Sequence, residues 1–254
     1  MRFQRGRCTA QALCAAVVVG LAASSPAQAV VPLEPTEPDV VLNHRTPKGT
    51  ILMAHAGAFL FGSPRVPVEK ALSRRFRGAG YDVRGLAYPL FDYPAAVAYA
   101  VRAARRARRH GPVFVVGQSA GGALAAELAT RRLVDGAVLV AGLTDFRAVP
   151  ISPERQRYYE RVIRVPNGWA SSPIRGFARS RRAPVYAFHS PFDRVMPFSQ
   201  SLALNRHSGV RLRRLSGRHL DDRSWVPEAR RWLDRLASRA RARGSSSPSG
   251  PRTR

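Results

Sequence analysis

A serine flanked by glycines is the residue whose surroundings most clearly predict chemistry. Ser119 lies in the segment GQSAGG (residues 117–122), directly after the apolar run 113–116. A G-x-S-x-G segment between a strand and a helix holds its serine in a sharp, strained turn, where neighbouring glycines avoid a Cβ clash. The hydroxyl then stands at the positive end of a helix, which favours a developing negative charge. We therefore predict that Ser119 is a nucleophile and that Gly117 and Gly121 form its turn. The alternative is a tight turn that merely contains a serine.

A second segment, HAGAFLFGS at residues 55–63, follows the apolar run 50–54. Together the two segments resemble the α/β-hydrolase superfamily, especially the bacterial carboxylesterases near hormone-sensitive lipase, whose HGGGF-type loop supplies oxyanion-hole amides. The resemblance implies that the backbone N–H groups of Gly57, Ala58 and Ala120 face the carbonyl oxygen of a bound ester. Each such donor typically contributes about 2.7–4 kcal/mol in the transition state.

This loop departs from the family because alanines stand at 56 and 58, where glycine is usual. An alanine keeps its amide but resists a positive φ by roughly 1–2 kcal/mol. We expect His55 to hold the loop by hydrogen bonding and not to act as a base. A third segment, YPLFDYPAAV at residues 88–97, resembles the YRLAPE…FPAA segment of the same esterases, although it is shorter and lacks the arginine. Asp92 in it is expected to be a loop or helix-capping residue.

The resemblance also implies a triad in the chain order Ser, Asp, His. HSPFDRVMP at residues 189–197 resembles the G-x-x-D-x-x-V-P loop after the penultimate strand, so Asp193 is the predicted acid and Asp145 the alternative. His219 follows the apolar run 210–215, where this fold presents its histidine, and is the predicted base. Weaker candidates for the base are His44, His110, His189 and His207. His219 would take the proton of Ser119, and water would hydrolyse the acyl-enzyme. No HExxH, CxxC or phosphate-loop motif is present, so no metal or cofactor is expected.

The elements that must position these residues follow from an alternation of apolar runs and helical patterns between residues 50 and 243. Nearly continuous apolar runs are typical of parallel strands buried on both faces. The alternation predicts an α/β fold, a mostly parallel central sheet with helices on both faces. Strands are expected at 50–54, 81–87, 113–116, 137–140, 185–188 and 210–215, and helices at about 67–78, 94–109, 120–132, 199–207 and 227–242. Residues 146–182 break the alternation and are predicted to form a short lid insertion over the C-terminal edge of the sheet, where ligands bind in such folds.

The two ends of the chain carry different signals. Residues 1–29 have the arginines, the short apolar core and the A-x-A site of a secretory signal peptide, with cleavage expected after Ala29. The mature protein would then be secreted or extracytoplasmic and would lose both cysteines, Cys8 and Cys14; an uncleaved anchor is the alternative. Residues 30–47 are predicted to be a Pro-rich arm or an edge strand, 48–243 the hydrolase domain, and 244–254 a disordered tail.

Composition and charge narrow the possible classes of protein. With 254 residues and 45% apolar side chains, the chain can bury a core, which excludes a disordered chain or a disulfide-stapled mini-protein. The formal net charge is +26, yet Lys48 and Lys70 are the only lysines, and such an arginine bias can reflect coding composition. We expect a mostly solvated basic surface, without specific nucleic-acid binding, and leave open an electrostatic attachment to acidic envelope polymers.

These observations predict a secreted serine carboxylesterase acting on small-molecule esters with small to medium acyl chains. A lipase, a polyester hydrolase, a peptidase or an acyltransferase would use the same triad. The alternative from another class is an exported binding protein that uses the basic surface of a hydrolase scaffold without catalysis. The sequence leaves open the natural substrate and the oligomeric state.

Overall fold

A seven-stranded sheet forms the centre of the protein in the computed structural model, which describes residues 39–165, 170–178 and 182–245. The predicted signal peptide, half of the predicted arm (residues 30–38) and most of the predicted tail lie outside these residues. The strand order is β1-β3-β2-β4-β5-β6-β7, and only β1 is antiparallel to its neighbour. The strands are β1 Val40–Leu42, β2 Thr50–Ala54, β3 Asp82–Gly85, β4 Val113–Gln118, β5 Gly136–Val140, β6 Val185–His189 and β7 Val210–Arg214.

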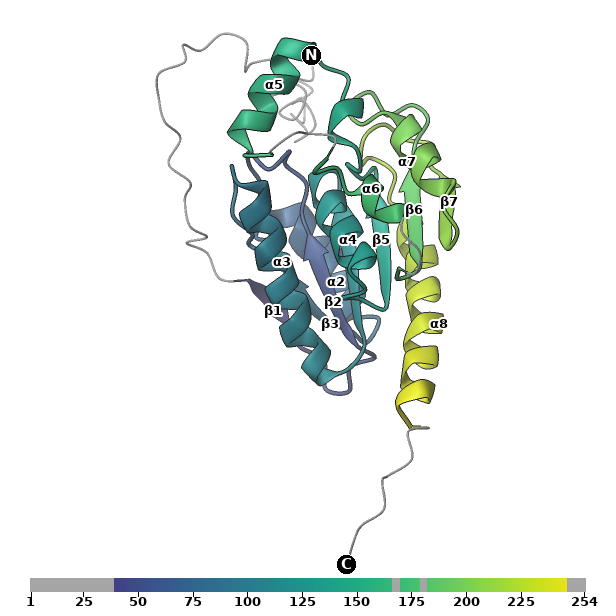
Figure 1. Ribbon diagram of the computed structural model, residues 1–254. Helices are drawn as coiled ribbons and strands as arrows, with labels where there is room; N and C mark the ends of the chain where they lie inside the picture. The colour runs from purple at the N-terminus through teal and green to yellow at the C-terminus, as the bar shows by residue number, and fades with distance from the viewer. Residues whose placement is uncertain (1–38, 166–169, 179–181, 246–254) are drawn as a thin grey trace, which may run out of the picture.

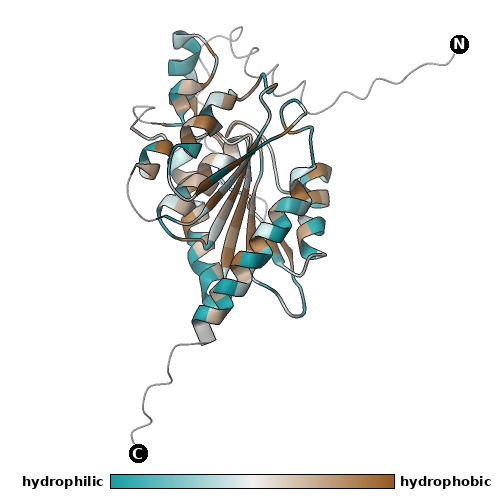
Figure 2. Cartoon of the chain, turned by 90° about the vertical axis from the view of Figure 1, so that its right-hand side faces the viewer, coloured by the Kyte–Doolittle hydropathy of each residue, from teal (hydrophilic) through white to brown (hydrophobic). Residues whose placement is uncertain are grey.

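Helices cover both faces of the sheet and divide the core into two layers (Figures 1 and 2). On one face, α3 (Tyr93–Ala107) and α4 (Ala120–Thr130) pack against Leu52, Val115 and Leu139. On the other face, α2 (Pro67–Arg77) and α8 (Trp225–Ser245) pack against the alternate residues of the same strands. The short helix α7 (Phe198–Asn205) contributes Leu204 to the first layer. The predicted fold class is therefore confirmed.

The central strands are buried because their sequences are apolar on both faces. All six residues of β4 and all five of β5 and of β6 are buried, as expected for parallel strands between two helical layers. Helix α3, by contrast, is buried on one face only. Ala96, Ala100 and Ala104 are buried. The arginines on its other face, Arg102, Arg105 and Arg106, are exposed.

Several element boundaries differ from the prediction. The predicted strand 81–87 is too long, since the N–H of Tyr81 bonds to Phe76 at the end of α2 and the strand β3 covers only Asp82–Gly85. Helix α3 ends at Ala107 and continues as the 3₁₀ turn η1 (Arg108–His110). The sheet begins with β1, inside the segment predicted to be an arm or an edge strand, and α8 runs to Ser245, two residues into the predicted tail.

The predicted lid segment, residues 146–182, holds the 3₁₀ turn η2 (Phe146–Ala148) and the helices α5 (Pro153–Val162) and α6 (Ile174–Phe177). Helix α5 stands above the C-terminal edge of the sheet (Figure 1). Its buried Tyr159 donates a hydrogen bond of 2.9 Å to the carbonyl oxygen of Ala58, in the loop after β2. Within the described part of the chain, no helix combines the length and the apolar character needed to cross a membrane.

Candidate active site

Ser119 occupies a strained turn between β4 and α4, with φ 50° and ψ −117°. The turn brings backbone segments so close together that side chains have no room. A Cβ added to Gly117 would lie 2.2 Å from the carbonyl oxygen of Gly121. A Cβ on Gly121 would lie 2.2 Å from the carbonyl oxygen of Ala54, at the end of β2. Glycine is therefore required at both positions, and the same contact places the turn of Ser119 beside the loop that follows β2.

The loop after β2 also has strained backbone geometry. Gly57, Ala58 and Phe59 have φ values of 132°, 55° and 60°. The alanine thus adopts the left-handed conformation that alanine resists. The carbonyl oxygen of Gly57 accepts hydrogen bonds from Leu60 and Phe61, at 2.9 and 3.0 Å, which closes the turn. Together with the Tyr159 bond to Ala58, these contacts hold the loop in its strained form.

Three backbone N–H groups near the turn have no acceptor among the described residues. They belong to Gly57, Ala58 and Ala120, the residues predicted to form the oxyanion hole. Gly57 and Ala120 are buried and Ala58 is half-buried. Buried N–H groups are nearly always paired in folded proteins. These three are therefore suited to donate to an oxygen atom of a bound molecule.

His55, at the start of the same loop, holds it through contacts with Ala56 and Tyr88. Its ring stacks on Tyr88 with a centroid distance of 4.2 Å, and its Nδ1 bonds to the carbonyl oxygen of Ala56 at 2.7 Å. The Tyr88 hydroxyl donates to the carbonyl oxygen of His55 at 2.9 Å. Burial lowers the pKa of His55 to about 4. His55 therefore makes the structural contacts expected from the sequence.

The loops after β6 and β7 bring the predicted acid and base together. His219 Nδ1 lies 2.7 Å from Asp193 Oδ2. The other oxygen of Asp193 accepts hydrogen bonds from the N–H groups of Val195 and Met196, both at 2.9 Å. Burial alone would raise the pKa of Asp193, but the hydrogen bonds from His189 and His219 outweigh it and hold that pKa well below its usual range. An ionised Asp193 accepts the Nδ1 proton of His219, so the neutral imidazole carries its lone pair on Nε2, as a general base must.

His189, one of the weaker candidates for the base, is a second histidine on the same carboxylate. Its Nε2 lies 3.2 Å from Asp193 Oδ2 and 3.0 Å from the carbonyl oxygen of Met196. Because both of these oxygens accept, Nε2 carries the proton, and Nδ1 accepts from the Ser201 hydroxyl at 2.7 Å. His189 therefore helps to hold the carboxylate of Asp193, the predicted acid, in place. In the sequence, the feature that could indicate this contact is that His189 lies four residues before Asp193.

One hydrogen bond ties the loop of His219 to the turn of Ser119. Arg223, four residues after His219, donates from Nη1 to Oε1 of Gln118 at 2.8 Å. Ser119 and His219 are both buried. The triad of Ser119, Asp193 and His219 is therefore a prediction that the placement of these loops supports.

The alternative acid, Asp145, has other partners. Its carboxylate caps the turn η2 by accepting from the N–H of Arg147, and it also accepts from the Ser172 hydroxyl. Asp92 has the capping role that was predicted, because its Oδ1 accepts from the N–H of Ala95 at the start of α3, at 2.8 Å. Neither carboxylate takes part in the pair of Asp193 and His219.

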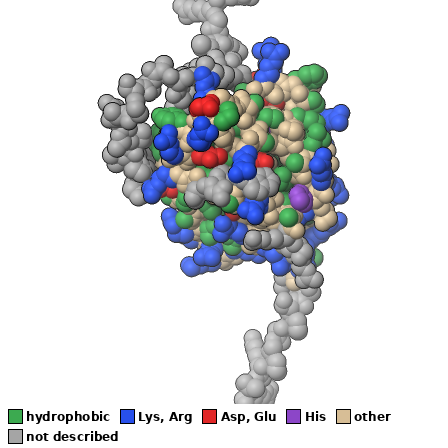
Figure 3. Space-filling view, turned by 45° about the horizontal axis from the view of Figure 1, so that its top comes forward, with side chains coloured by type: hydrophobic (Ala, Val, Ile, Leu, Met, Phe, Trp, Pro, Cys, Tyr) green, Lys and Arg blue, Asp and Glu red, His purple; other side chains and the backbone are tan. Residues whose placement is uncertain are grey.

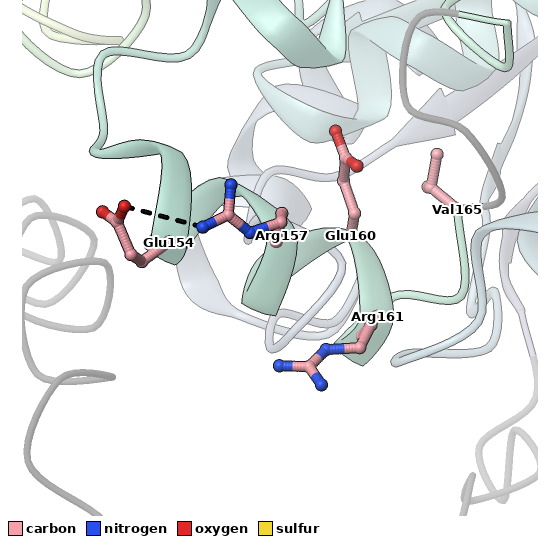
Figure 4. Close-up of a pocket in the computed structure, with 5 residues that line it drawn as sticks. All are labelled: Glu154, Arg157, Glu160, Arg161 and Val165. Carbon is pink, nitrogen blue, oxygen red and sulfur yellow. Dashed lines mark ion pairs between the residues drawn. The ribbon is translucent and has the colours of Figure 1, made fainter.

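A hollow of about 570 Å³ lies along α5 (Figure 4). It is lined by Glu154, Arg157, Glu160, Arg161 and Val165, with an ion pair of 3.5 Å between Glu154 and Arg157. None of these five belongs to the predicted active site, and four of the five are charged. The hollow is therefore a poor match for an acyl chain.

The basic surface does not form a single patch on the face seen in Figure 3. Lys and Arg side chains are scattered over it, with Asp and Glu among them. Among the described residues, no group of three or more His, Cys, Asp and Glu side chains is placed to hold a metal ion.

Residues 51–187 match the family described as the alpha/beta hydrolase fold. No curated protein matches the chain in sequence.

Solved structures share the fold at low sequence identity. One is an acetyl ester-xyloside bifunctional hydrolase from Caldicellulosiruptor lactoaceticus, with 20% identity, 85% of this chain and 92% of that chain covered, and a TM-score of 0.64. Another is a thermophilic esterase from Thermogutta terrifontis with propionate bound (18%, 84% and 91%, TM-score 0.61). A third is esterase B from Lactobacillus rhamnosis with a tributyrin phosphonate (16%, 81% and 81%, TM-score 0.66).

Proposed function

Since the chain belongs to the α/β-hydrolase fold family, we propose that it is a serine carboxylesterase that cleaves esters with small to medium acyl chains through Ser119, His219 and Asp193. The resemblance expected from the sequence is confirmed by this membership. The observation that carries the proposal is the 2.7 Å hydrogen bond between His219 and a deeply buried, ionised Asp193, on a loop tied to the turn of Ser119.

The reaction follows from the roles of these groups. His219 Nε2 takes the proton of the Ser119 hydroxyl as the oxygen attacks the acyl carbon. The carbonyl oxygen becomes negative and accepts hydrogen bonds from the N–H groups of Gly57, Ala58 and Ala120. His219 then gives its proton to the departing alkoxide, which leaves as the alcohol. A water molecule repeats the sequence on the acyl-enzyme and releases the acid, while Asp193 stabilises the imidazolium in both halves.

The class of substrate is supported by the fold neighbours. The names of those proteins refer to an acetyl ester, a propionate and a tributyrin analogue, all with short acyl groups. Among its described residues, the predicted lid segment holds the turn η2 and the short helices α5 and α6, and lid elements this short favour small substrates over large lipid aggregates. The signal at residues 1–29 supports export, which N-terminal sequencing of the protein recovered from its medium would test by finding Val30 first.

The test is hydrolysis of p-nitrophenyl esters from acetate to laurate by the wild-type protein and by Ser119→Ala. We expect hydrolysis that is fastest on acetate or butyrate and a loss of about 10⁵-fold or more in the variant. A folded wild-type protein that cleaves none of these esters would contradict the proposal. If that silent protein also bound polyanions in a strongly salt-dependent way, the non-catalytic binding function would replace it.

A further inference from the structure

Glu69 is a buried carboxylate to which the proposed reaction gives no role. It lies in the first turn of α2 and only 5% of its surface is exposed. Both of its oxygens accept hydrogen bonds of 2.9 Å from Nε2 of Gln118, the residue before Ser119. It also contacts the backbone N–H of Ala56, the residue before Gly57. One carboxylate therefore touches both the turn of the nucleophile and the predicted oxyanion loop.

The contacts continue through Gln118 to a third segment. Arg223 donates to the other end of the Gln118 amide, at 2.8 Å, and lies on the loop that carries His219. The amide of Gln118 can satisfy both neighbours in only one orientation, with nitrogen toward the carboxylate and oxygen toward the guanidinium. We call Glu69, Gln118 and Arg223 the polar bridge.

The charged groups of the polar bridge indicate that it sets the relative placement of the segments it joins and does not merely fill space. When Glu69 is ionised, its charge and that of Arg223 attract each other across the neutral amide of Gln118, and the side chains of Glu69 and Gln118 are buried. Burying an ion pair seldom adds net stability compared with apolar residues of similar volume. Directed hydrogen bonds do, however, specify one relative placement of the segments that they join.

We propose that the polar bridge is a positioning device, in which Glu69 and Arg223 fix the loop of His219 against the turn of Ser119 so that the imidazole meets the hydroxyl. This inference rests on the proposed function. Glu69 and Arg223 touch no reacting atom, so they act through Gln118 and His219. A loop misplaced by about 1 Å costs on the order of 100-fold in rate.

The experiment measures kcat, KM and the burst amplitude on p-nitrophenyl acetate for Arg223→Ala, Glu69→Gln and the double variant. We expect kcat of Arg223→Ala to fall about 10- to 100-fold, with KM changed less than about threefold. The double variant should lose no more than the more impaired single variant, because both substitutions break the same chain of contacts. Arg105→Ala is the matched control, since Arg105 is exposed on α3, in the layer opposite α2 and α8; its kcat should equal that of the wild type.

Chemical rescue separates positioning from folding. Guanidinium ion, at concentrations far below those that unfold proteins, should restore part of the kcat of Arg223→Ala, and urea at the same concentrations should not. Unchanged kcat in folded Arg223→Ala would overturn the polar bridge. A second contradicting result has two parts. The reduced kcat of Arg223→Ala is not restored by guanidinium, and the loss of kcat in the double variant is the product of the losses in Arg223→Ala and Glu69→Gln. A folded wild-type protein that hydrolyses none of the p-nitrophenyl esters overturns the proposed function itself, and the bridge with it.

Discussion

The two halves of the candidate active site are held in place by different physics. The turn of Ser119 is fixed by backbone sterics, where Gly117 and Gly121 let chain segments approach too closely for any Cβ. The loops of Asp193 and His219 are fixed by polar side chains from separate elements, including His189, through hydrogen bonds of 2.7–3.2 Å. The first half should be insensitive to pH and intolerant of added atoms. The second half should tolerate a change in side-chain shape better than a change in the protonation state or charge of a side chain.

The largest effect should come from changing one atom in the polar half. In Asp193→Asn, the amide oxygen can still accept from Val195 and Met196, but its NH₂ group then faces His219 Nδ1. His219 must accept at Nδ1 and carry its proton on Nε2, the wrong tautomer for a base. We expect kcat to fall by about 10⁴-fold, with some loss of stability because the NH₂ group also faces the N–H of His189. Steady-state kinetics with thermal unfolding checks this, and a loss below tenfold would count against Asp193 as the acid.

Adding one methyl group should break the steric half. In Gly121→Ala, the new Cβ would lie 2.2 Å from the carbonyl oxygen of Ala54, so backbone must move. We expect a loss of about 2–4 kcal/mol in the free energy of unfolding, by denaturant titration, and a clear loss of kcat. Gly78→Ala is the control, because Gly78 has a helical φ of −62° and a nearest contact of 3.3 Å. Equal stability of the two variants would contradict the steric account.

The pH dependence of stability sharpens the comparison. Burial raises the pKa of Glu69 from 4.5 to about 7, against the lowering effects of Arg223, the Ala56 N–H and Gln118. The folded protein thus keeps a proton that the unfolded chain releases, and stability from this group falls as pH rises between these two values. Glu69→Gln cannot titrate, so relative to it the wild type should lose roughly 2–3 kcal/mol between pH 5 and pH 8. Denaturant titrations across that range measure the difference, which should be constant if Glu69 is ionised throughout.

The smallest effect is expected where α5 touches the oxyanion loop. Tyr159→Phe removes the hydrogen bond to Ala58 and keeps the ring, which costs about 0.5–1.5 kcal/mol. If this bond holds the amides in place, kcat/KM on p-nitrophenyl butyrate should fall about two- to tenfold. Tyr158→Phe, on the same helix, is the control, since its hydroxyl bonds to none of the described residues. Identical kcat/KM values in the two variants would remove α5 from the account of catalysis.

The same contrast explains what could be predicted from sequence. The turn of Ser119 is encoded within six residues, so its glycines reveal it. The parallel strands are apolar runs, and their alternation with helices predicts the sheet. The short strand β1 could not be located in this way, because three residues within a Pro-rich segment are too few to show a repeating pattern of hydrophobicity.

The polar half was harder to predict, because its contacts span long stretches of chain. Asp193 and His219 were found through a family resemblance and not through any local pattern. Glu69 and Arg223 lie 49 and 105 residues from Gln118. A glutamate in the first turn of a helix ordinarily faces water, so nothing in the sequence indicates that Glu69 is buried.

The central claim is that Ser119 is activated by the imidazole of His219. It is tested most directly by labelling the wild-type protein with a fluorophosphonate at neutral pH and mapping the modified peptide by mass spectrometry. We predict one phosphonyl group, on Ser119, and a labelling rate at least about 100-fold lower in His219→Gln. Label on another residue, or labelling of Ser119 at an unchanged rate without His219, would contradict it.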